Sequence, residues 1–101
     1  NTLNAEALAL HTRGQITDAC LKFAEAARSP GASINVLLNG LEVCVELVER
    51  PDLNTREWRA ECEVFLLALN TLDTGDHRYP WYQSLLARLE RVTQALLAAS
   101  S

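Results

Sequence analysis

The chain has 101 residues, of which 49% are hydrophobic and 22% are charged. This composition excludes a disordered chain, and the length is that of one domain, residues 1–101, with its own core. The net charge of −4 at pH 7 disfavours nucleic acid as a partner, because that affinity depends largely on lysine and arginine side chains. We expect no membrane contact, since the chain has neither a run of roughly 18 apolar residues nor a signal-peptide pattern.

Two helices are predicted at the start of the chain. Apolar residues recur at helical spacing over residues 2–13, and Gly14 can adopt the left-handed conformation that ends a helix. A second apolar pattern covers residues 16–29 and stops at Ser29-Pro30-Gly31. The short link at Gly14 predicts that these two helices form an antiparallel hairpin.

The third helix is predicted over residues 33–50, with Ser33 as its N-cap. Its residues are apolar nearly all round, which indicates a central helix that is covered on several sides. Asn54 followed by Glu57 resembles the capping box that opens a helix. The fourth helix is therefore predicted over residues 54–73.

The fifth helix is predicted over residues 80–99, with Pro80 at its first position, where a missing N–H group loses no hydrogen bond. Its apolar residues alternate four- and three-residue steps, as in a coiled coil. They are Tyr82, Leu85, Leu89, Val92 and Leu96. This stripe either covers the end of a helical array or pairs two copies of the chain. Arg88 and Arg91 lie outside the stripe, and we expect them to be solvated.

The three cysteines are Cys20, Cys44 and Cys62, which lie in apolar stretches and form no Cys-x-x-Cys pair. Extracellular disulfide frameworks more often use an even number of cysteines, so we expect reduced core residues and a cytoplasmic protein. The chain also lacks methionine, even at position 1. We therefore expect a fragment of a longer protein, with a further region upstream.

The first hairpin resembles a tetratricopeptide repeat, a helix-turn-helix unit of about 34 residues with small residues at its helix crossings. The resemblance follows from aligning Gly14 with the turn glycine of the repeat. The matching positions are Ala7 and Leu10 in the first helix, and Ala19, Phe23 and Ala26 in the second. The opening tryptophan of the repeat is Leu3 here, and Pro30 closes the unit one residue from the usual place.

The second pair of helices resembles a repeat with a longer linker. Asn39-Gly40 lies near the Asn-x-small motif of the first helix of a repeat, and Ala60 and Val64 fall on positions of its second helix. The resemblance implies an all-α fold of antiparallel helical hairpins in a right-handed array. The fifth helix is then the C-terminal cap that such arrays need.

The whole chain is similar to the C-terminal helical domain of bacterial response regulators, in which a receiver domain precedes a tetratricopeptide-like output domain. Residues 30–32, 36–39 and 78–79 carry this similarity. It implies a protein–protein interaction module, the output or scaffold domain of a bacterial two-component signalling protein, with a protein or peptide partner. The alternative is a structural element that forms homodimers through the fifth helix.

The resemblance also implies where the partner binds, because tetratricopeptide repeats hold their partners on the surface formed by the first helix of each pair. The corresponding residues are Asn4, Leu8 and His11, and in the third helix Leu37, Asn39 and Leu41. Neither stretch offers a lysine or arginine, so a clamp for a terminal carboxylate is disfavoured. The alternative is that these leucines belong to the core, and that the Asn39 amide bonds to a neighbouring helix backbone rather than to a bound chain.

Two further groups of residues have two interpretations each. Glu42, Glu46 and Glu49 share one helix face, which is either a solvated edge or a docking site for a basic partner. Trp81 and Tyr82, at the start of the fifth helix, either lock the turn onto the core or anchor an interface.

Enzymatic and metal-binding functions are disfavoured. His11 and His77 lie near predicted helix ends and the cysteines lie in helix middles, so no thiolate–histidine pair is expected. No pair of Cys, His or carboxylate residues shows a ligand spacing such as His-x-x-x-His. We therefore expect no catalytic residue, no metal site and no cofactor.

Overall fold

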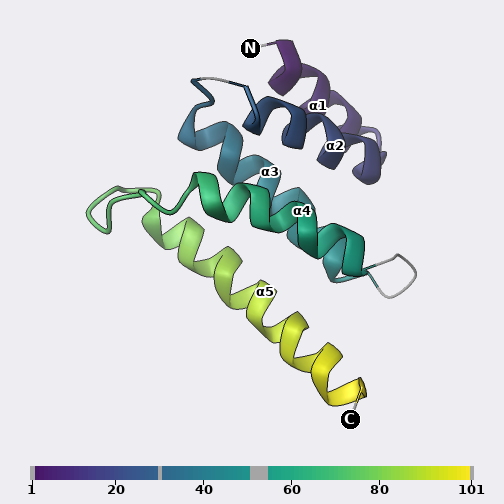
Figure 1. Cartoon of the computed structure of the whole chain (residues 1–101). Coiled ribbons are helices and arrows are strands. Elements are labelled where there is room, and N and C mark those ends of the chain that lie inside the picture. Colours follow the sequence, from purple (N-terminus) through teal and green to yellow (C-terminus); the bar gives the residue numbers. More distant parts are fainter. Residues whose placement is uncertain (1, 30, 51–54, 101) are drawn as a thin grey trace.

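A computed structural model describes residues 2–29, 31–50 and 55–100 (Figure 1). These residues form five α-helices and no β-strand, which confirms the predicted all-α class. The helices are α1 (Thr2–Thr12), α2 (Ile16–Ala27), α3 (Ile34–Val48), α4 (Thr55–Ala68) and α5 (Tyr79–Ser100). In this part of the chain, no helix has both the length and the hydropathy needed to cross a bilayer.

The turn between α1 and α2 is short because of Gly14. Its φ angle is 81°, a left-handed conformation that is readily adopted by glycine. The Gln15 amide donates to the Leu10 carbonyl over 2.9 Å, and the Gly14 amide donates to the His11 carbonyl over 3.0 Å. These bonds satisfy two carbonyl groups at the end of α1. The chain then reverses, and α2 packs along α1 as the predicted hairpin.

The centre of the bundle is α3, as its apolar sequence predicts. It packs against α2, α4 and α5, while α1 packs mainly on α2 (Figure 1). The Ser33 hydroxyl accepts a hydrogen bond from the Val36 amide over 3.2 Å, which confirms the predicted N-cap. The buried residues of α3 are Val36, Leu37, Leu38, Gly40, Leu41, Val43, Cys44, Val45, Leu47 and Val48. The core therefore follows α3 along its length.

Small residues are buried where the helices pack against one another. Ala7, Ala19 and Ala26 are fully buried in the first hairpin. Gly40 of α3 faces Phe23 of α2 and Phe65 of α4, and a methyl group there would collide with both side chains. Ala60, which falls on a second-helix position in the resemblance to a repeat, is exposed. The buried face of α4 instead carries Trp58, Cys62, Phe65 and Leu69.

The fourth helix ends at Ala68, five residues before the predicted end at residue 73. The Leu69 amide still donates to the Phe65 carbonyl, but the Leu72 amide donates to the Leu69 carbonyl in a tighter turn. Asn and Thr, which occupy positions 70 and 71, compete with helical hydrogen bonding through their side chains. The predicted capping box at the start of this helix lies outside the described residues.

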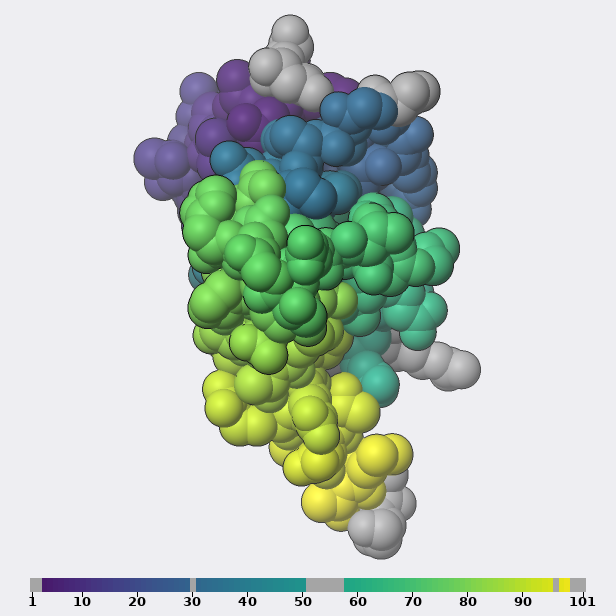
Figure 2. All heavy atoms as spheres, turned by 90° about the vertical axis from the view of Figure 1, so that its left-hand side faces the viewer, coloured from purple at the N-terminus to yellow at the C-terminus, as the bar shows by residue number. Residues whose placement is uncertain are grey.

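The last helix begins at Tyr79, so Pro80 occupies its second position rather than its first. Both positions lie in the first turn, where backbone N–H groups have no partner within the helix. Figures 1 and 2 show that the C-terminal part of α5 extends beyond the other four helices. Among the described residues, α2 and α3 are a closely packed pair, whereas α4 and α5 are not. The α1/α2 pair packs on the α3/α4 pair through α2 and α3, but α5 does not pack on α4 in the same way.

Candidate binding surface

The three predicted binding residues of the first helix lie in different environments. Leu8 is 41% exposed. Asn4 is half-buried, and its Oδ1 atom is buried without a hydrogen-bond partner among the described residues. His11 Nε2 lies 3.1 Å from Glu46 Oε2, so this histidine links α1 to α3. Of the three, Leu8 offers the exposed apolar surface.

Leu37 and Leu41 are not available to a partner. They are 4% and 0% exposed, and they belong to the core where three helices pack on α3. Leu37 and Leu41 therefore do not line a groove across α1 and α3, contrary to the prediction. The burial supports the alternative interpretation, in which these leucines are core residues. The predicted α3 positions therefore do not extend the exposed surface around Leu8.

Asn39 is half-buried, and no side-chain hydrogen bond within the described residues involves it. The expected bond to a neighbouring helix backbone is therefore not formed. An unpaired amide is costly only when it is removed from water. Because Asn39 is only partly buried, its amide can form hydrogen bonds with water.

The acidic edge of α3, formed by Glu42, Glu46 and Glu49, is a seam between helices. Glu46 pairs with His11 of α1, as described above, and Glu42 Oε1 accepts a hydrogen bond from Trp81 Nε1 of α5 over 3.1 Å. Glu46 and Glu49 keep 40% and 35% of their side chains exposed, so the edge is partly solvated, as one interpretation predicts, while its carboxylates also pair with other helices. Docking of a basic partner there stays a prediction. The edge holds α1 and α5 against α3.

The third residue of this edge makes the closest ion pair. Glu49 Oε1 accepts from Arg88 Nη2 over 2.6 Å, and Glu49 Oε2 accepts from Arg88 Nε over 3.2 Å. These two bonds raise the pKa of the Arg88 guanidinium above its usual value. The expectation that Arg88 is solvated is corrected, because the planar guanidinium is used to fix α5 beside α3.

The aromatic residues at the start of α5 lie against the core. Trp81 and Tyr82 are partly buried and pack on the core cluster. The Tyr82 ring lies 5.8 Å from that of Tyr79, at an interplanar angle of 60°. Burial, together with Tyr79, raises the pKa of the Tyr82 hydroxyl. These contacts favour the interpretation in which the two residues lock the turn onto the core.

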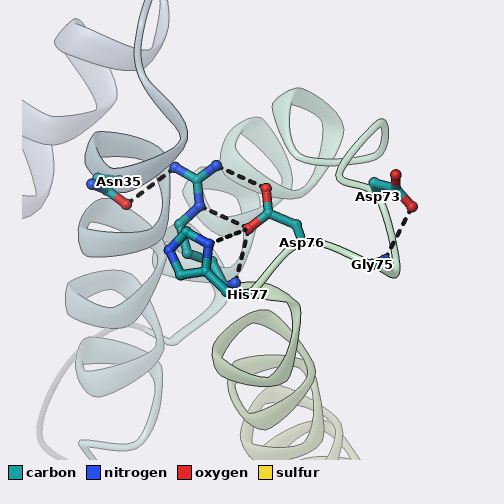
Figure 3. Close-up of polar contacts among 6 residues, drawn as sticks. Asn35, Asp73, Gly75, Asp76 and His77 are labelled. Atoms are coloured by element: carbon teal, nitrogen blue, oxygen red, sulfur yellow. Dashed lines mark hydrogen bonds and ion pairs between the residues drawn. The ribbon is translucent and has the colours of Figure 1, made fainter.

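A polar clamp holds the loop before α5 (Figure 3). Asp76 Oδ1 accepts hydrogen bonds from the Arg78 backbone amide over 2.8 Å and from Arg78 Nε over 2.9 Å. Its Oδ2 accepts from Arg78 Nη2 over 2.8 Å, and Arg78 Nη1 donates to Asn35 Oδ1 of α3 over 3.3 Å. The hydrogen bonds from Arg78 hold the pKa of Asp76 well below its usual range. The clamp therefore ties the start of α5 to the start of α3.

A groove lies between α4 and α5, two helices that are not closely packed against each other. Its volume is about 480 Å³. It is lined by Arg59, Ala60, Glu63 and Leu66 of α4 and by Leu89 and Thr93 of α5. We call this feature the α4/α5 groove. The groove thus has both apolar residues and side chains of both charges in its lining.

Two exposed leucines continue the walls of the α4/α5 groove. Leu67 is 72% exposed and follows Glu63 by one helical turn on α4. Leu97 is 65% exposed and follows Thr93 by one turn on α5, in the part that extends beyond the bundle. In the α4/α5 groove, a cavity therefore lies next to large exposed apolar side chains.

Sequence reasoning missed this groove. The signal that was present is Leu67, which falls outside the four- and three-residue steps of the buried residues Trp58, Cys62, Phe65 and Leu69. A large apolar residue off the buried face of an amphipathic helix indicates either a second contact or an exposed patch. Leu66 and Leu89 also line the groove, but both pack against the core, so their spacing does not set them apart. The remaining lining residues have small, polar or charged side chains that are typical of a solvated helix face.

Comparison with known proteins does not extend these observations. The chain matches no protein-family model, and neither the curated proteins nor the solved structures gave a significant match.

Within the described ranges, no three His, Cys, Asp or Glu side chains are arranged to hold a metal ion. His11 and His77 have the carboxylate partners Glu46 and Asp76. The cysteine thiols lie in the core and contact one another.

Proposed function

We propose that this chain is a protein–protein interaction module that binds a helical segment of its partner in the α4/α5 groove. The observation that carries the proposal is the groove itself, a cavity of about 480 Å³ between two helices. The apolar residues that line it offer a binding energy that does not depend on direction, while Arg59 and Glu63 select among partners by charge. Such an arrangement is typical of grooves that receive an amphipathic helix.

The dimensions of the groove favour a helix as the occupant. Arg59, Glu63 and Leu66 succeed one another by one turn each along α4, a length of about 10 Å. This length matches two turns of a partner helix, whose apolar residues at positions i and i+4 would contact Leu66 and Leu89. Leu67 and Leu97 extend the contact by one turn each.

In this proposal the module is the output or scaffold domain of a bacterial signalling protein, acting in the cytoplasm, and it has no catalytic role. The tetratricopeptide-like character of the first hairpin supports it, since Ala7, Ala19 and Ala26 are buried at the positions that a repeat reserves for small residues. The binding surface lies on the last two helices rather than on α1 and α3, because Leu37 and Leu41 are buried.

Filling the groove tests this proposal. Ala60 lines the groove and is exposed, so Ala60→Trp should occupy the cavity without disturbing the core. Ala9 is exposed on α1, and Ala9→Trp adds the same side chain elsewhere. A partner is first isolated from a lysate of the source organism on the immobilised chain, and its affinity is then measured by calorimetry with purified proteins.

We expect Ala60→Trp to weaken binding by at least about tenfold, or about 1.4 kcal/mol, and Ala9→Trp to leave it unchanged. Equal affinity for both variants would place the partner elsewhere on the surface. Retention of the same proteins by the unfolded chain would contradict the proposed function itself.

The alternative, homodimerisation through α5, is favoured by one observation. Leu97, near the C-terminal end of α5, is 65% exposed. Sedimentation velocity at micromolar concentration distinguishes the two functions. A dimer that Leu97→Asp dissociates, and that Leu21→Asp on the exposed face of α2 does not, would support the alternative. A monomer at every concentration would reject it.

A further inference from the structure

The three cysteines meet in the core, although they come from three different helices. Cys20 of α2 and Cys44 of α3 are fully buried, and their Sγ atoms are 2.9 Å apart. The Cys44 thiol also donates to the Trp58 carbonyl oxygen over 3.7 Å. Cys62 of α4 provides the third thiol beside Cys44. Cys44 is therefore the shared neighbour in this cluster.

We propose that Cys20 and Cys44 form a reversible intramolecular disulfide when the protein meets a small peroxide, and that this bond locks the first hairpin onto α3. The two sulfur atoms need to approach by less than about 1 Å to reach the bond length of about 2.05 Å. This short approach of the two sulfur atoms is the reason to expect the cross-link between α2 and α3. This site is independent of the α4/α5 groove, and it does not rest on the proposed function.

The reaction balances with hydrogen peroxide as the oxidant. One thiolate attacks a peroxide oxygen, the O–O bond breaks and an S–O bond forms; the hydroxide that leaves takes up the proton that the thiol lost and becomes water. The second thiol then attacks the sulfur of the sulfenic acid, an S–S bond forms, the S–O bond breaks and a second water leaves. In all, two thiols lose two electrons and two protons, and the peroxide accepts them.

Burial makes this disulfide slow to form. The hydrogen bond with Cys20, that with Cys62 and the burial of the side chain all raise the pKa of the Cys44 thiol. Thiolate, the reactive form, is therefore scarce in the closed core. The oxidation proceeds when local opening of the contact between α2 and α3 admits the peroxide. The cross-link then persists, because it restricts the same opening.

Peptide mapping of the full chain tests the pairing. The folded protein is exposed to hydrogen peroxide, its free thiols are alkylated in denaturant, and it is digested with trypsin. Lys22 separates the peptides of Cys20 and Cys44, and Arg59 separates the latter from that of Cys62. We expect a linked pair of peptides that contains Cys20 and Cys44, two hydrogen atoms lighter than the reduced pair, with Cys62 alkylated.

Two variants provide the matched comparison. Cys62→Ala should retain the link, and Cys20→Ala should abolish it. The oxidised wild-type protein should melt at least about 10 °C above the reduced protein, a shift that a reductant reverses and that Cys20→Ala lacks. The map of the wild-type protein decides the pairing even where a variant fails to fold.

Three results would overturn the proposal. The first is a disulfide between Cys44 and Cys62 in place of the one with Cys20, and the second is a disulfide between two chains. The third is full alkylation of all three thiols after peroxide treatment at a denaturant concentration below the unfolding midpoint. The last condition increases local opening, so that slow access alone would not explain the absence of a disulfide.

Discussion

Substituting Gly40 by alanine tests the close packing of α3 against α2 and α4. The added methyl carbon would lie 2.8 Å from Phe65 Cζ and 2.9 Å from Phe23 Cβ, and closer still to Phe65 Cε1. Carbon atoms in ordinary contact are about 3.5 Å or more apart. Phe23 Cβ is fixed to the backbone of α2, so α2 itself must move by about 0.6 Å to relieve that contact.

Two opposing effects determine how much Gly40→Ala changes the free energy of unfolding. Overpacking a well-filled core destabilises a protein by about 1–3 kcal/mol, and the upper end applies here because both phenylalanines are fully buried. Alanine favours a helix interior over glycine by about 1 kcal/mol. The net loss in the free energy of unfolding is therefore about 2 kcal/mol. For a domain of this size, this corresponds to a fall in Tm of roughly 10 °C.

Thermal unfolding followed by circular dichroism measures this effect. Gly75→Ala is the control, because the nearest atom to its added carbon is Asp73 Oδ1, at 3.8 Å, and the change should stay within about 0.5 kcal/mol. Phe65→Leu should restore part of the loss when it is combined with Gly40→Ala, since it removes the ring from the collision. A rise in Tm for Gly40→Ala would refute the packing argument, because helix propensity alone predicts that rise.

Three further predictions follow from polar and thiol groups. Asp76 has a lowered pKa because Arg78 binds its ionised form, so this pair stabilises the fold above about pH 4 and loses its effect as the pH falls through the folded pKa. The Tm difference between wild type and Asp76→Asn should therefore be largest near pH 7 and vanish in strong acid; a constant difference would contradict this assignment. Trp81→Phe keeps the ring packing but removes the donor to Glu42, and should lower the free energy of unfolding by about 1 kcal/mol, whereas an unchanged Tm would show that the bond is not formed in solution. At neutral pH, the Cys44 thiol, whose pKa is raised, should react with a thiol reagent at least about a hundredfold more slowly than free cysteine, and denaturant should remove this protection.

Local signals in the sequence predict the helices well. Gly14 and Ser33 mark helix ends through conformations and hydrogen bonds that involve only neighbouring residues. The central position of α3 also follows from its composition, because a helix that is apolar on every side needs cover on every side. The end of α4 was placed too late, since Leu69 and Leu72 continue the apolar spacing after the backbone has left the helix.

The candidate site was less predictable, because it depends on contacts between distant elements. The pairing of Glu42 and Glu49 with α5 requires knowledge of the direction in which α5 crosses α3. The same crossing opens the α4/α5 groove and covers the leucines of α3. A pattern along one helix identifies its apolar side chains, but not which of them a neighbouring helix covers.

The central position of α3 also determines how the fold can come apart. A linear repeat array frays from its ends, because each unit contacts only the next one. Here α2, α4 and α5 all cover the same helix, so removal of any one of them uncovers part of the shared core. Partial unfolding from the C-terminus is therefore costly, because it removes α5 from α3, and truncation before Tyr79 would leave a chain prone to aggregation. The molecule should melt as one cooperative unit rather than in successive steps.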